Sequence, residues 1–192
     1  WDLYAISFLL IFIKTEYNPT AVELGLATAA VQGGALVGAL LGGLVADRLG
    51  RKRVFILTMV LFIVLAAAQG FSTNIWDLII IRFLLGIPLG SDIANGYAYI
   101  MESMSKGTRE TMGSRWQFMF GLREVFAILI ITAMYLTGID HELLWRIGLA
   151  MGAIPALVLL LARLDLPETP MSLLHRGQFR KAKQVSRQLF GD

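Results

Sequence analysis

The sequence contains no cysteine, and only 16% of its 192 residues are charged. Without cysteine, disulfide frameworks, thiol nucleophiles and zinc–thiolate sites are excluded. The low charge comes with 56% hydrophobic residues and a mean hydropathy of +0.66, whereas soluble domains are about 45–50% apolar and about 25% charged. This composition excludes an ordinary soluble enzyme, a disordered regulator and a nucleic-acid-binding tail, and it predicts a membrane protein.

Histidine is almost as scarce, since the sequence has only two, His141 and His175. They fall in segments that we expect on opposite sides of the membrane, so no serine–histidine–acid set and no metal-binding cluster can be assembled from them. The sequence therefore predicts no enzymatic activity, no metal site and no cofactor.

Long apolar runs dominate what is present. A spanning helix needs roughly 20 mostly apolar residues, because the hydrocarbon core of a bilayer is about 30 Å thick. The sequence predicts an all-α membrane protein whose six transmembrane helices occupy 1–13, 24–46, 54–76, 76–101, 116–138 and 144–164. The first run is too short to span alone, so we expect its helix to begin before Trp1. Residues 1–165 would form the helical bundle, and 166–192 a cytoplasmic motif with a basic amphipathic helix.

The basic residues predict the orientation of this bundle. Of 17 lysines and arginines, thirteen fall in the loops after the second and fourth spans and in the tail, and only Lys14 and Arg146 fall in the opposite loops. Cytoplasmic loops carry an excess of positive charge. The pattern therefore predicts an integral protein of the plasma or inner membrane with both termini in the cytoplasm. It also explains the net charge of +3 without a nucleic-acid partner.

Glycine recurs at every fourth position of the second span, at Gly34, Gly38 and Gly42. This spacing lines one helix face with hydrogen atoms, so that a neighbouring backbone can approach closely. The stripe fits static helix packing, a smooth surface on which helices slide, or both.

The segment after this stripe concentrates charge at a predicted turn. Asp47 would lie at the C-terminal end of a helix, where the helix dipole disfavours an anion, so we expect it to need a cationic partner or a neighbouring helix N-terminus. Gly50 permits a tight turn. Such a corner can latch two helix bundles together in one conformation and release them in another. The residues assigned to this conformational gate are Gly43, Asp47, Arg48, Gly50, Arg51 and Lys52.

Residues 43–52 resemble the signature loop between the second and third helices of the major facilitator superfamily. Further motifs resemble its sugar-porter and metabolite–proton symporter branch: Arg82 to Gly86 with Gly90, the pair Glu102 and Arg109, Trp145-Arg146 with Pro155, and Leu166-Pro167-Glu168-Thr169-Pro170. The resemblance implies the N-terminal six-helix half of that fold, built from 3+3 helix repeats. It also implies a second six-helix half, in the same parent chain or as a homodimer, and it adds Glu102, Arg109, Pro167 and Glu168 to the gate.

Ionisable residues inside the predicted spans are costly in lipid and should face a partner or water. Asp2 and Arg82 match positions where the family carries an acidic residue and an arginine, which implies a proton-coupling pair. A nearby cation favours the ionised carboxylate and burial favours the protonated one, so protonation from outside can free the arginine. A fixed structural ion pair is the alternative.

Asp92 follows Arg82 by nearly three helical turns, close to the expected middle of the membrane. Phosphate and organic-anion relatives often carry an aspartate at this position, so we assign Asp92 to proton coupling as a second protonatable group. Neutralisation by a neighbouring helix is the alternative. Asn95, one turn away, is expected to share the cavity face and to contact substrate.

The fifth predicted span carries the other candidate substrate contacts. Gln117 matches a sugar-contacting glutamine of the family, and an amide can both donate and accept hydrogen bonds from a polyol. Arg123 and Glu124 lie deeper in the span but point about 100° apart, which disfavours a mutual ion pair. Three alternatives follow for Arg123: contact with an anionic substrate, an ion pair with Asp2 or Asp92, or a feature specific to this chain.

The sequence thus predicts half of a secondary active transporter that carries a sugar or similar small metabolite with protons by alternating access. The alternatives are an organic-anion or phosphate–proton symporter, or a non-transporting membrane receptor or assembly module. Its expected partners are the lipid bilayer, a small-molecule substrate, protons and a second six-helix half.

Overall fold

The structure is a computed structural model that describes residues 2–103, 106–164, 168–175 and 177–190. Within these segments the side chains are described everywhere except at 2–4, 101–103, 106–114, 116–117, 120, 175 and 187–190.

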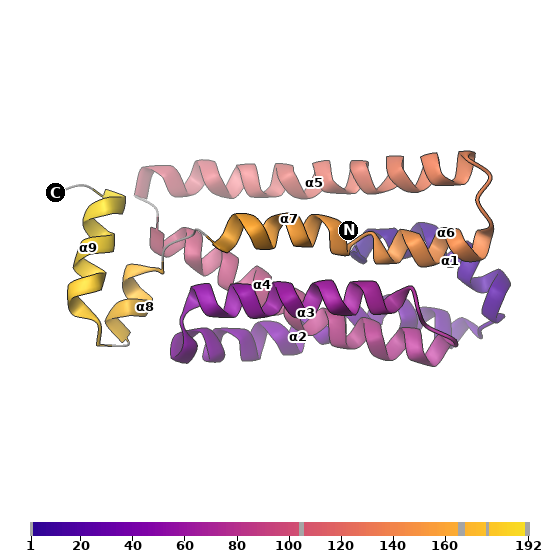
Figure 1. Ribbon diagram of the computed structural model, residues 1–192, viewed down its shortest axis with the longest axis horizontal. Helices are drawn as coiled ribbons and strands as arrows, with labels where there is room; N and C mark the ends of the chain where they lie inside the picture. The colour runs from indigo at the N-terminus through magenta and orange to yellow at the C-terminus, as the bar shows by residue number, and fades with distance from the viewer. Residues whose placement is uncertain (1, 104–105, 165–167, 176, 191–192) are drawn as a thin grey trace.

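The described chain is helical throughout, with turns between the helices and no strand. The helices are α1 (Asp2–Tyr17), α2 (Ala21–Leu49), α3 (Arg51–Gln69), α4 (Ile75–Ser103), α5 (Lys106–Leu136), α6 (His141–Ala150), α7 (Ala153–Leu164), α8 (Pro170–His175) and α9 (Phe179–Phe190). Figure 1 shows α1 to α7 running roughly along one long axis, with α5 on one side of the bundle and with α8 and α9 at one end. The predicted spans largely coincide with these helices, although the third, predicted to reach residue 76, ends as α3 at Gln69, and the fifth ends as α5 at Leu136.

The sixth predicted span is divided into α6 and α7 by a turn at Met151 and Gly152. Pro155 explains this break, because proline has no N–H to donate and its ring collides with the carbonyl group four residues earlier.

The start of α2 is also determined by residues that are close together in the sequence. Thr20 and Glu23 form a capping box in which Glu23 Oε2 accepts from the Thr20 backbone N–H at 2.8 Å.

Helices α2 and α4 approach each other closely along the glycine stripe. A Cβ added at Gly38 would lie 1.9 Å from the Ile87 carbonyl oxygen, and one added at Gly90 would lie 1.9 Å from the Ala35 carbonyl oxygen. Glycines on both helices therefore make this contact possible, which confirms the predicted close approach of a neighbouring backbone.

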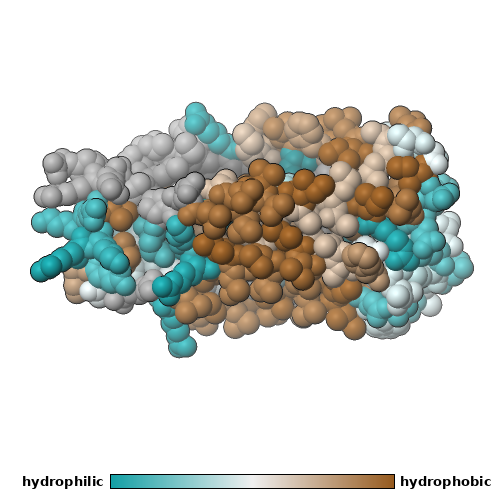
Figure 2. Space-filling view, in the orientation of Figure 1, coloured by the Kyte–Doolittle hydropathy of each residue, from teal (hydrophilic) through white to brown (hydrophobic). Residues whose placement is uncertain are grey.

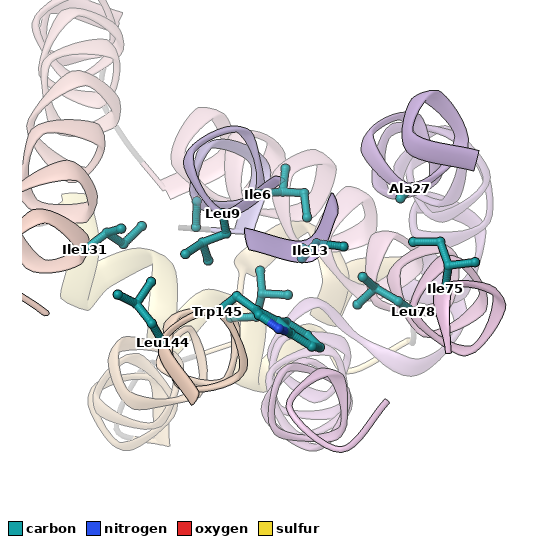
Figure 3. Packing of buried hydrophobic residues seen from close by; sticks show 11 residues of the cluster. Ile6, Leu9, Ile13, Ala27, Ile75, Leu78, Ile131, Leu144 and Trp145 are labelled. Atoms are coloured by element: carbon teal, nitrogen blue, oxygen red, sulfur yellow. The ribbon is translucent and has the colours of Figure 1, made fainter. Parts of the chain in front are cut away.

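Two apolar clusters join the remaining helices. Figure 3 shows Ile13 of α1 beside Trp145 of α6, with Ile131 of α5 on one side of the cluster and Ile75 of α4 on the other. The second cluster lies among α2, α3, α4 and α7 and contains Val31, Met59, Phe62, Ala66, Leu85 and Ala156. Because both clusters combine helices distant in sequence, α1 to α7 pack as one bundle.

The outer surface of this bundle is apolar in its middle. Figure 2 shows a hydrophobic band around the centre of the visible face and hydrophilic groups at the two ends. Within the part of the chain that the structure describes, three helical segments are long and apolar enough to cross a membrane: α2, α3 and the combined segment His141–Leu164.

The tail forms two short helices, α8 and α9, instead of the single basic amphipathic helix predicted within residues 166–192. A turn at Gly177, with φ of +70°, separates α8 from α9. Leu173 and Ala182 are buried. The positive φ favours glycine, and the turn brings the two helices together.

Candidate functional site

The turn between α2 and α3 carries the residues predicted to form a gate. Gly50 adopts φ of 99°, in the region that favours glycine, and its N–H donates to the Ala46 carbonyl oxygen at 2.9 Å. This turn brings Arg51 Nη2 to 3.6 Å from Asp47 Oδ1. The cationic partner predicted for Asp47 is therefore Arg51, four residues along the chain.

Glu168 links the chain after α7 to the start of α3. Its Oε1 accepts from the backbone N–H of Lys52 at 3.1 Å, and the Lys52 Nζ donates to the Leu164 carbonyl oxygen at 2.6 Å. Gly50 offers no side-chain cap to α3, so the carboxylate from the distant segment satisfies one of its free N–H groups. An anion at this position is also favoured by the helix dipole.

Asn95 joins the same corner from α4, which corrects its predicted position on the substrate cavity with Asp92. Its Oδ1 accepts from Arg51 Nη1 at 3.0 Å, and its Nδ2 donates to the carbonyl oxygens of Ser91 at 2.9 Å and Gly42 at 3.3 Å. The close approach of α2 and α4 buries this amide completely. Its hydrogen bonds therefore tie α2, α3 and α4 together.

Asp92 is held by an arginine of another helix, as the structural alternative for it anticipated. Arg163, in the last turn of α7, donates through Nη1 to Oδ1 and through Nη2 to Oδ2, the latter at 3.1 Å. The Arg163 guanidinium also lies 4.6 Å from the ring centroid of Phe55. Asp92 thus lies opposite the last turn of α7.

A cavity of about 540 Å³ opens beside Asp92, between α5 and the rest of the bundle. Asp92 and Arg123 bring charge to its wall, whereas the other lining side chains are mostly apolar and include Met59, Phe62, Leu89, Phe126 and Leu159. The structure therefore brings Asp92 and Arg123 to one cavity. Glu124 is half-buried on α5 and is not part of the described lining.

Arg82 is completely buried inside the apolar bundle. Its Nε donates to the Ala27 carbonyl oxygen at 2.7 Å, and its Nη1 donates to Gln69 Oε1 at 3.1 Å. A guanidinium can be held in such surroundings only with several hydrogen bonds and a compensating charge. Its predicted partner, Asp2, belongs to α1, but the Asp2 side chain lies outside the described residues.

Some of the other predicted site residues are described by the structure and some are not. Among the gate residues, Arg48 is exposed, and a Cβ added at Gly43 would meet nothing within 4 Å. Pro167 and the side chains of Glu102, Arg109 and Gln117 lie outside the described residues.

The end of the bundle opposite the turn between α2 and α3 carries an ionic network that the sequence did not predict as a site. Glu16 of α1 accepts hydrogen bonds from Trp145 Nε1 and, at 2.9 Å, from Arg146 Nη2. Arg146 Nη1 also donates to the carbonyl oxygens of Gly70 and Ser72, in the turn between α3 and α4. Because Glu16 and Arg146 are far apart in the sequence, this network could not be predicted before the packing of α1 against α6 was known.

An apolar helical bundle with a completely buried arginine and a charged corner at one end is the architecture of a membrane transporter of the major facilitator type. The chain belongs to the family described as "Sugar (and other) transporter", whose profile matches residues 2–192. That family consists of transporters and not of enzymes, and the chain corresponds to the N-terminal half of its fold.

Curated relatives are similar over nearly the whole chain. The chain is 34% identical over 185 residues to the D-xylose transporter of Levilactobacillus brevis, covering 96% of this chain and 40% of that protein. It is 31% identical over 192 residues to the glucose transporter GlcP of Staphylococcus epidermidis, covering 100% of this chain and 42% of that protein. The chain thus spans about two-fifths of the length of these relatives.

Solved structures have the same fold. The xylose transporter XylE from E. coli, in a partially occluded inward-open conformation, matches with a TM-score of 0.91 and 23% identity, covering 100% of this chain and 52% of that chain. The proton:xylose symporter XylE bound to 6-bromo-6-deoxy-D-glucose matches with a TM-score of 0.90, also at 23% identity, covering 100% of this chain and 46% of that chain.

Proposed function

We propose that this chain forms half of a proton-coupled symporter that carries a sugar or a similar small metabolite by alternating access. The observation that carries the proposal is the corner where Glu168 holds the start of α3 and Arg51 holds Asn95. These contacts join three helices and the chain after α7 at one end of the bundle. They have the properties of a gate, because they are electrostatic and lie next to exposed charges.

Asp47 is the proposed point of contact between this gate and the second half. Its side chain is 54% exposed although it is paired with Arg51, and it stands at a helix end that disfavours negative charge. A cation from a second bundle would therefore stabilise it when the inner side is closed. Gly43, Arg48, Gly50, Lys52, Glu102, Arg109 and Pro167 complete the proposed gate.

Proton coupling is assigned to Asp2 and Arg82, with Asp92 as a second protonatable group. In the proposed cycle, ionised Asp2 compensates the buried guanidinium of Arg82. A proton from outside neutralises the carboxylate, and Arg82 then depends on its bonds to Ala27 and Gln69. This change in charge would bias the bundle toward substrate binding.

Substrate contacts are assigned to Gln117, Arg123 and Glu124 of α5, whereas Asn95 serves the gate. The relatives named for D-xylose and glucose support a sugar as the first choice. A specific observation favours the organic-anion alternative, since the Arg123 guanidinium lies on the wall of an otherwise mostly apolar cavity, where the Asp92 carboxylate is paired with Arg163. An organic anion with an apolar body is therefore the second candidate substrate.

Binding measurements across pH distinguish these substrate classes. Neutral hexoses and pentoses should bind to the purified protein in detergent, and organic anions and inorganic phosphate should compete weakly or not at all. Binding of anions alone would overturn the sugar assignment. Binding of sugar without accumulation in sealed proteoliposomes would favour a receptor or assembly module over a transporter.

The second six-helix half is proposed to come from the same parent chain or from a second copy. Cross-linking of the 192-residue chain in detergent tests the homodimer, which should appear as a species of twice the mass. A strictly monomeric chain without activity would instead favour a partner half in a longer polypeptide.

We also propose that both termini face the cytoplasm. Labelling of Lys181 with a membrane-impermeant reagent from either side of sealed vesicles tests this orientation.

A further inference from the structure

The surface of α8 and α9 combines positive charge with exposed apolar side chains. We call this the tail surface, and it consists of Met171, Leu174, Phe179, Arg180, Lys181 and Lys183, all of them exposed. Phe179 is the most exposed of its apolar members, at 67%. The sequence from Pro170 to Phe190 contains no aspartate or glutamate, so no acidic residue within α8 and α9 can neutralise this charge.

The apolar side chains that are buried in the two tail helices are not those of the tail surface. Leu173 and Ala182 are buried, and the turn at Gly177 closes the helix pair. Phe179 and Lys183 are four residues apart on α9, so they share one face of that helix. An exposed aromatic ring beside lysine is an arrangement typical of helices that lie in the membrane interface.

The connection to α3 fixes the tail surface at the edge of the apolar band. Glu168, two residues before α8, accepts a hydrogen bond from the backbone N–H of Lys52. The Lys52 Nζ also donates to the Leu164 carbonyl oxygen. Lys52 is the second residue of α3, whose apolar length can cross a bilayer. Figure 1 shows α9 lying across this end of the bundle, and Figure 2 shows hydrophilic groups beyond the hydrophobic band there. The tail therefore begins at the depth where lipid headgroups would be.

We propose that the tail surface binds the headgroups of anionic phospholipids in the adjacent leaflet. Arg180, Lys181 and Lys183 supply the electrostatic attraction, and the apolar members enter the boundary between headgroups and acyl chains. Near an anionic leaflet each basic side chain strengthens the association by roughly fivefold. Salt weakens this attraction because it screens exposed charges.

Hydrogen–deuterium exchange of the full chain in nanodiscs tests the proposal. The backbone of 179–186 should exchange at least several-fold more slowly in phosphatidylcholine containing phosphatidylglycerol than in phosphatidylcholine alone. High salt should remove the difference, and inorganic phosphate added to phosphatidylcholine nanodiscs should not reproduce it. Equal exchange in the two lipids would overturn the proposal, and protection independent of lipid would indicate docking on protein.

Two variants make the test specific. The substitution R180Q/K181Q/K183Q should abolish the lipid-dependent protection, whereas R180K/K181R/K183R keeps the charge and should retain it. Exchange in α2 and α4 should be unchanged in both variants, because the substituted side chains are exposed on the tail. Protection that survives in the glutamine variant would assign lipid binding to other basic residues and would contradict the proposal. Sugar transport plays no part in this experiment, so its result is independent of the proposed function.

Discussion

Asp92 of α4 and Arg163 of α7 form a two-point ion pair on the wall of the cavity beside α5. The pair joins the cavity to the start of α3, because the residue after Arg163, Leu164, supplies the carbonyl oxygen to which Lys52 Nζ donates. A change in the charge of Asp92 would therefore affect both the cavity and the segment that leads to Glu168.

The ion pair itself can be tested by stability. Asp92→Ala leaves a largely buried guanidinium without its carboxylate, and breaking such a pair costs about 3–5 kcal/mol. Thermal unfolding in detergent should record a marked loss, and the swap D92R/R163D should recover part of it. Arg163→Lys is the matched control, since it keeps the charge and loses the two-point geometry. A swap no more stable than Asp92→Ala would contradict a specific pair.

The glycine contact between α2 and α4 predicts opposite outcomes within one helix. Gly38→Ala introduces a Cβ 1.9 Å from the Ile87 carbonyl oxygen, so the helices must separate, and we expect a loss of about 1–3 kcal/mol in unfolding free energy. Gly25→Ala is the control, because its Cβ would meet nothing within 4 Å. Alanine should be neutral there or stabilising by up to about 1 kcal/mol. Equal effects of the two substitutions would contradict the close approach.

The hydrogen bond from the Lys52 backbone N–H to Glu168 predicts that Glu168 stabilises the first turn of α3. Glu168→Ala should destabilise the first turn of α3 by about 1 kcal/mol, a loss typical of a removed helix cap. Hydrogen exchange at residues 52–54 measures it directly. Glu168→Gln retains an acceptor and should lose less, and exchange in the last turn of α3 should be unaffected. Unchanged exchange in the alanine variant would show that Glu168 does not cap the helix.

Arg146 forms one largely buried ion pair, with Glu16, and one more exposed ion pair, with Glu142, and the two should differ in strength. Double-mutant cycles should give a coupling energy for Glu16 and Arg146 of about 1–3 kcal/mol. The pair Glu142 and Arg146 should give less than about 0.5 kcal/mol, because the Glu142 side chain is 65% exposed. Comparable coupling in both cycles would contradict the assignment of Glu16 as the main partner.

The sequence predicted the helices, the glycine contact and the turn at Gly50 because each depends on local composition or on spacing along one helix. It also predicted an ionic partner for Asp47, since a helix end disfavours an anion. It did not predict Arg163 as the partner of Asp92 or Glu16 as the partner of Arg146. Those pairs depend on the register between packed helices, which the spacing within each helix does not determine.

The position of Asn95 also depends on the packing between helices, which the sequence did not predict. Its position one turn from Asp92 suggested a shared cavity face, yet the close approach of α2 buries its amide against Gly42 and Arg51. The two residues lie in one helix but serve different neighbours, because α2 and α7 contact α4 from different directions.

Proton uptake driven by substrate is the most direct test of the central claim that ionisable groups inside the bundle exchange protons with water during transport. The measurement uses proteoliposomes that contain the protein with its second half, from the parent chain or a second copy. We predict that sugar added to the native protein drives proton uptake and that Asp2→Asn abolishes it while sugar binding remains. Undiminished proton uptake in Asp2→Asn would remove Asp2 from the mechanism and contradict this account of coupling.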